Sequence, residues 1–191
     1  MPKIYTKAAS GDEVLKIVFE TIDANYKDLQ ETDAKISVIF IESELDDDGN
    51  EKSAAIKFAG VKAAAKIKVE SAENRALYKA DARLLIDKRA WDDMDHAQQS
   101  ALIDHELCHL VVCRDAKGMV IQHDDLRPKL RTRPDDWLIN GFREVVERHG
   151  ESAIDYQNVR SIVFAKDSKQ NLLFDFAKDI GLKPKREKVP A

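Results

Sequence analysis

The sequence predicts a small α+β domain in which a mixed sheet packs against several helices. The chain has 191 residues, which is enough to bury one substantial core. Hydrophobic residues make up 43% and charged residues 35% of it, a composition typical of folded globular proteins. Segments with strand character and segments with helix character follow one another without repeated strand–helix–strand units, which favours α+β over a parallel α/β fold.

The N-terminal half is predicted to hold one helix and three strands. Apolar residues recur at helical spacing over residues 11–29, behind a capping-box pattern formed by Ser10 and Glu13. Three runs rich in branched or alternating apolar residues predict strands, at 36–41, 65–69 and 82–87.

The C-terminal half is predicted to be mostly helical. Asp95 and Gln98 form a second capping-box pattern, which opens a helix that we expect to run to about Val112. A later helix is expected to be capped by Asp135 or Asp136 and stopped by Gly150. The other expected elements are a turn at 114–118, a strand at 119–122, that helix at 137–149, a strand at 159–164 and a helix at 168–180. We expect one domain over residues 1–150, with 151–191 as a C-terminal extension packed on it.

Charge, hydropathy and cysteine content exclude several classes of protein. The net charge of −4 gives no support for a nucleic-acid partner, although one stays possible. No apolar run approaches the roughly 18 to 20 residues that a membrane span needs, and Met1 to Asp12 lacks the pattern of a secretory signal. The two cysteines, Cys108 and Cys113, do not make a disulfide scaffold. These features predict a cytoplasmic protein.

The most informative segment is a His-Glu-x-x-His pattern at His105, Glu106 and His109. Residues four apart on a helix lie on the same face, so one metal ion can contact both imidazoles. Zinc accepts imidazole nitrogen at about 2.0 to 2.1 Å and lowers the pKa of a bound water to about 7. Glu106 lies next to His105, where it can take the proton of that water. The pattern therefore predicts a zinc-dependent hydrolase.

The surroundings of the pattern support a metal site. An apolar stripe faces the core, and the two histidines lie off it, on a face flanked by Leu102 and Val112. Two polar rings against apolar neighbours are costly without a partner, which a metal would supply. Cys108 points away from both imidazoles and is interpreted as a packing residue. The stripe consists of Ile103, Leu107, Leu110 and Val111.

A zinc site of this kind needs a third protein ligand. His123 is our first choice, because it follows the helix after a short turn and has Asp124 beside it. Glu144, on the helix expected at 137–149, is the second choice, and water or another group stays open. The sequence does not select an oxyanion-stabilising donor among Arg127, Arg131, Arg133, His149 and Tyr156.

The segment from Asp81 to Gly150 resembles the phage metallopeptidase family, a zincin-like group. The resemblance is carried by residues 81–87, Trp91, 102–109, 123–124 and 142–150. It implies a zinc peptidase fold with Zn²⁺ as cofactor, Glu106 as general base and a peptide or protein as substrate. For a phage-encoded protein it implies the host cytoplasm as location. A histidine after a hairpin is also similar to SprT-like proteases, and by analogy with zincins the strand at 82–87 would form the sheet edge that pairs with a peptide.

The alternative is a catalytically inactive, zinc-stabilised binding module with a protein or nucleic-acid partner. Its support is a basic cluster formed by Arg127, Lys129, Arg131 and Arg133. Glu106 separates the two hypotheses, because a purely structural zinc site has no use for a carboxylate there. The oligomeric state stays open.

Overall fold

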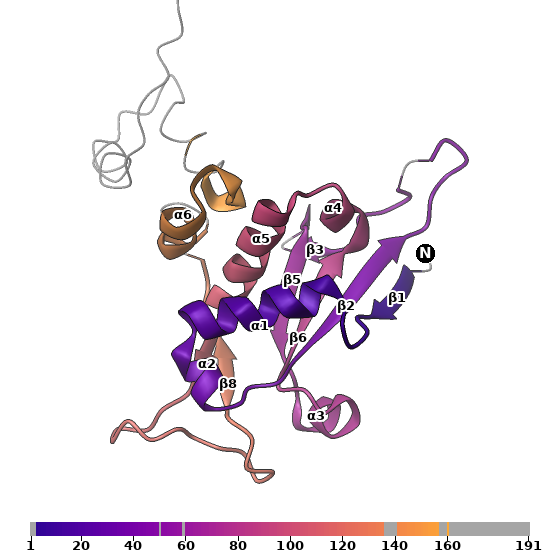
Figure 1. Cartoon of the computed structure of the whole chain (residues 1–191). Coiled ribbons are helices and arrows are strands. Elements are labelled where there is room, and N and C mark those ends of the chain that lie inside the picture. Colours follow the sequence, from indigo (N-terminus) through magenta and orange to yellow (C-terminus); the bar gives the residue numbers. More distant parts are fainter. Residues whose placement is uncertain (1–2, 50, 59, 136–140, 157–159, 161–191) are drawn as a thin grey trace, which may run out of the picture. The chain divides into compact units, whose positions relative to one another are not determined.

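The computed structural model describes residues 3–49, 51–58, 60–135, 141–156 and 160 (Figure 1). The chain divides into two compact units, Met1–Pro134 and Asp135–Ala191. The helix predicted at 168–180 and, apart from residue 160, the strand predicted at 159–164 lie outside the described residues. The expectation of one domain over 1–150 with a packed extension stays a prediction.

A four-stranded mixed sheet forms the centre of the first unit. The parallel pair β2 (Ile36–Ser43) and β6 (Ala82–Asp87) lies inside, and β1 (Lys3–Lys7) and β5 (Ala65–Val69) are added antiparallel at the two edges. This confirms the predicted mixed sheet and its three predicted strands.

The expectation that residues 82–87 form the edge of the sheet is wrong. β6 pairs with β2 on one side and β5 on the other, so β5 is the edge strand on that side. The physical reason is burial, since Ala82, Leu84 and Ile86 are fully inaccessible and an interior strand hides such side chains best.

The predicted helix over 11–29 is present as two helices, α1 (Glu13–Asn25) and α2 (Lys27–Glu31). They are separated at Tyr26, whose φ of −126° and ψ of 64° are not helical. The predicted capping box at Ser10 is not formed. Gly11 has a φ of 105°, so the helix begins after it, with Asp12 at the N-cap.

The main core lies between the sheet and two helices, α1 and α5 (His96–Cys108), on one of its faces (Figure 1). α4 (Lys88–Asp92) adds Trp91, whose ring centroid lies 6.0 Å from that of Phe40 in an edge-to-face contact. The opposite face carries a smaller apolar cluster of Ile41, Ala55 and Ile56. The helix with the His-Glu-x-x-His pattern is therefore seated directly on the sheet.

The other elements of the first unit are short. They are α3 (Ala72–Tyr78), the hairpin of β3 (Lys57–Phe58) with β4 (Val61–Lys62), and the pair β7 (Leu110–Val112) and β8 (Leu130–Thr132). Between β7 and β8, residues 113–129 form an arm. It contains the predicted turn at 114–118, but residues 119–122 make only isolated bridges, Arg114 with Val120 and Gln122 with Pro128, instead of the predicted strand.

In the second unit, α6 (Arg143–His149) is followed by η1 (Gly150–Ser152), a turn of 3₁₀ helix. Phe142 is the N-cap of α6, so the described helix begins later than the predicted residue 137, whereas Gly150 ends it with a φ of 53°, as predicted. Among the helices in the described part of the chain, none is both long and apolar enough to cross a membrane.

Candidate metal centre

The helix that carries the site begins as predicted and ends earlier than predicted. The capping box is formed, with Asp95 accepting from the Gln98 backbone and the Gln98 side chain accepting from the Asp95 backbone. α5 ends at Cys108 instead of about Val112, because Leu110–Val112 pairs with β8 as a strand. Two of these three residues are β-branched, which favours pairing in a sheet.

His105 and His109 lie together at this end of α5. Their ring centroids are 5.2 Å apart, with the rings at 80° to each other. His109 Nδ1 lies 2.8 Å from the carbonyl oxygen of Arg133. A carbonyl can only accept, so Nδ1 of the neutral ring carries the hydrogen and Nε2 carries the lone pair, as in metal-bound histidines.

Arg133 fastens the end of α5 to β8. Its backbone N–H donates to the carbonyl oxygen of His109 at 2.8 Å, and its Nε donates to the carbonyl oxygen of Cys108 at 2.6 Å. His109 and Arg133 continue the register of β7 and β8, one step beyond the pair of Leu110 and Thr132. The β7–β8 pairing therefore sets the position and the tautomer of His109.

Asp135 offers a carboxylate oxygen as a third possible metal-ligand atom. One ligand atom from each of His105, His109 and Asp135 lies within 4.8 Å of the others. Asp135 follows Arg133 by two residues, and the backbone of Arg133 is hydrogen-bonded to that of His109. The short chain between them limits how far Asp135 can lie from the imidazoles. Two imidazoles and a carboxylate are donors that zinc accepts, so these residues fit a divalent metal.

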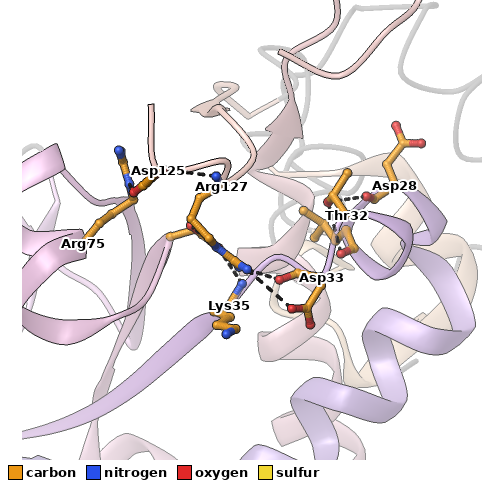
Figure 2. Close-up of polar contacts among 9 residues, drawn as sticks. Asp28, Thr32, Asp33, Lys35, Arg75, Asp125 and Arg127 are labelled. Atoms are coloured by element: carbon orange, nitrogen blue, oxygen red, sulfur yellow. Dashed lines mark hydrogen bonds and ion pairs between the residues drawn. The ribbon is translucent and has the colours of Figure 1, made fainter. Parts of the chain in front are cut away.

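His123, the expected third ligand, is not in this group. It lies in a turn of the arm, where its N–H donates to Arg127 and its carbonyl oxygen accepts from Leu126, both at 2.9 Å. Arg75 Nε contacts Asp125 at 3.2 Å, and Arg127 contacts Asp33, which ties the turn to α3 and to the loop before β2 (Figure 2). The second choice, Glu144, lies on α6 and is not in the group either.

Glu106 is nearly buried, with 5% of its surface exposed. Its Oε2 accepts a hydrogen bond of 2.7 Å from the backbone N–H of Ile67 in β5. The predicted base is thus held by the edge strand of the sheet, next to His105 in the chain.

The other side of the helix end is fixed by Tyr26. Its hydroxyl oxygen lies 2.6 Å from Asp104 Oδ1, 2.8 Å from the Asp104 carbonyl oxygen and 2.9 Å from Cys108 Sγ. Burial raises the pKa of Tyr26 far above its ordinary value, with additional contributions from Cys108 and Asp104, so the hydroxyl stays protonated and can donate. Asp104 and Cys108 immediately precede the two histidines, so this contact positions the end of the helix that carries both imidazoles. Cys108 is buried, in agreement with the packing role predicted for it.

Tyr26→Phe is expected to destabilise the protein by about 1 to 3 kcal/mol, because a buried carboxylate loses a hydroxyl donor. The free energy of unfolding in urea measures the effect. Tyr5→Phe is the matched control: Tyr5 is exposed, and its replacement is expected to change stability by less than about 0.5 kcal/mol. Equal effects of the two substitutions would contradict the role of Tyr26.

Two residues of the basic cluster that supported a binding module form hydrogen bonds within the chain. Arg127 hydrogen-bonds Asp81 and Asp33, and Arg133 hydrogen-bonds the end of α5. Lys129 and Arg131 are exposed. Two of the four cations therefore stabilise the fold, which weakens the case for a nucleic-acid surface.

Comparison with known proteins agrees with the geometry. A family model described as "Putative phage metallopeptidase" matches residues 6–166, which is most of the chain and includes the whole His-Glu-x-x-His pattern. The chain matches no curated protein and no solved structure. The match confirms the resemblance stated from the sequence, and the family implies a metal and a peptide substrate. The chain belongs to the phage metallopeptidase family.

Proposed function

We propose that this protein is a zinc-dependent peptidase of the zincin type, with Glu106 as general base. The observation that carries the proposal is that His105, His109 and Asp135 bring three possible metal-ligand atoms together. The buried carboxylate of Glu106 lies beside them, because it follows His105 on α5. A cytoplasmic location, in the host for a phage-encoded protein, is part of the same proposal.

The side chains divide the chemistry between them. His105, His109 and Asp135 would hold the metal, which when bound lowers the pKa of a water to about 7 and polarises the scissile carbonyl. Glu106 takes the proton of the attacking water and delivers it to the leaving nitrogen.

His123 remains the alternative third ligand from the sequence, and substitution distinguishes it from Asp135. The wild-type protein is expected to retain one zinc ion after dialysis, and His105→Ala to lose it. Asp135→Ala is expected to weaken zinc binding by at least about 100-fold, whereas His123→Ala retains the metal. Zinc content and affinity are measured on the full chain.

The proposal of peptidase activity is tested on the same proteins with an unfolded protein substrate and mass spectrometry of the products. Hydrolysis is expected to stop with a chelator and to return with added zinc. A wild-type protein that binds no divalent metal, or whose hydrolysis survives chelation, would overturn the proposal. If zinc is bound but no peptide is cut, the inactive binding module is the better description.

A further inference from the structure

The contact between Glu106 and β5 joins the candidate base to the sheet through a main-chain donor. Ile67 and Glu106 are 39 residues apart in the sequence, and each is 5% exposed. The bond of 2.7 Å is short for an N–H donor, as expected where a carboxylate accepts.

The register of β5 and β6 shows why this N–H is available. The backbone N–H of Asp87 donates to the carbonyl oxygen of Ala64 at 2.8 Å, and the backbone N–H of Glu70 donates to the carbonyl oxygen of Asp81 at 2.9 Å. In an antiparallel pair, alternate residues bond to the partner strand, so even-numbered residues from 64 to 70 bond to β6. Ile67 is odd-numbered, so its N–H points away from β6, towards α5.

We propose that the backbone N–H of Ile67 is a positioning group for Glu106 in the hydrolysis, an inference that rests on the proposed function. A sheet amide is fixed before substrate arrives, so it holds the carboxylate without the loss of side-chain entropy that a lysine or arginine partner would require. The side chain of Ile67 packs in the core, and only its N–H acts on the base.

Ile67→Pro tests the proposal, because it removes this N–H and leaves the hydrogen bonds of the neighbouring residues to β6 in place. The variant is expected to lower kcat by about 10- to 100-fold, with KM and zinc content within about twofold of wild type. Ile67→Val retains the N–H and is expected to retain activity. Tyr5→Pro removes an N–H that by register also points outward, on the opposite edge strand β1, and is expected to leave kcat unchanged.

A second measurement needs neither metal nor substrate. In the metal-free protein, Glu106→Ala is expected to speed hydrogen exchange of the Ile67 amide by at least about tenfold. The amide of Lys68, which bonds to β6, is expected to change by less than about twofold. This measurement tests whether the Ile67 N–H is hydrogen-bonded to Glu106, even if Ile67→Pro does not fold.

The outcomes separate the two proposals. Full kcat in a folded Ile67→Pro, with Glu106→Gln inactive, overturns the positioning role and leaves the peptidase assignment intact. Unchanged exchange of the Ile67 amide in Glu106→Ala overturns the contact itself. A wild-type protein with no hydrolytic activity overturns the proposed function, and with it the role of Ile67 in catalysis.

Discussion

Glu106→Gln is expected to lower kcat for peptide hydrolysis by about 10²- to 10⁴-fold while zinc stays bound. Glutamine has nearly the same size, and its amide oxygen can still accept the N–H of Ile67, so the substitution preserves the contact with β5. What it removes is the ability to take up and release a proton. Kinetics, zinc content and thermal unfolding of the full chain measure the three properties separately.

Glu73→Gln is the matched control, because this glutamate is exposed in the first turn of α3 and far in sequence from the motif. It is expected to change none of the three properties. If Glu106→Gln retained wild-type kcat, Glu106 would not be the base. If it lost zinc or unfolded, the carboxylate would be needed for the fold or for the metal site instead of for proton transfer.

The parts of the site that sequence predicts are those set by one local segment. The spacing of His105, Glu106 and His109 follows from helix geometry, and the Asp95 capping box forms as its residues predict. The strands at 36–41, 65–69 and 82–87 are present for a similar reason, since branched residues in short runs favour extended backbone.

The parts that sequence misses depend on pairing between distant segments. Asp135 carries no local signal of metal binding, and we predicted only a helix cap there. It comes to the imidazoles because Arg133 pairs with His109 at the end of the β7–β8 register. The same pairing ends α5 early. The break at Tyr26 has a comparable origin, because its hydroxyl contacts Asp104, which is 78 residues away.

The order of strands is likewise not visible in local patterns. The sequence of β5 alternates between apolar and polar residues, and that of β6 is mostly apolar. Neither pattern shows which of the two strands pairs with a neighbour on both sides. The central position of β6 follows from its parallel pairing with β2, whose residues lie 46 positions earlier in the chain. That order makes β5, not β6, the strand that reaches Glu106.

The arm that carries β8 back to the site is held by an ion pair whose loss should be costly. Arg127 Nε contacts Asp81 Oδ1 at 3.2 Å, and Asp81 is only 2% exposed. The second oxygen of Asp81 accepts from the Lys35 N–H at 2.8 Å. In Figure 2, Arg127 also reaches Asp33, in the loop that precedes β2. The hydrogen bond with Asp81 raises the pKa of Arg127, so the guanidinium stays charged throughout the ordinary pH range.

Arg127→Met is expected to destabilise the first unit by about 3 to 5 kcal/mol, because it leaves the buried carboxylate of Asp81 without its cation. Arg114→Met is the matched control in the same arm. Its partner Asp28 lies at 2.9 Å but is exposed, so its loss is expected to cost less than about 1 kcal/mol. Free energies of unfolding in urea compare the two, and adding Asp81→Asn to Arg127→Met is expected to recover part of the loss.

Arg127→Met is also expected to affect the candidate metal centre. The arm that holds Arg127 leads into β8 and on to Arg133, whose carbonyl oxygen contacts the ring of His109. Loosening the arm is therefore expected to loosen a proposed metal ligand that Arg127 does not touch. Arg127→Met is therefore expected to weaken zinc binding by about 10- to 100-fold, the usual effect of losing a group that orients a ligand, whereas Arg114→Met leaves it unchanged. Equal zinc affinity in the two variants would show that β8 holds His109 without help from the arm.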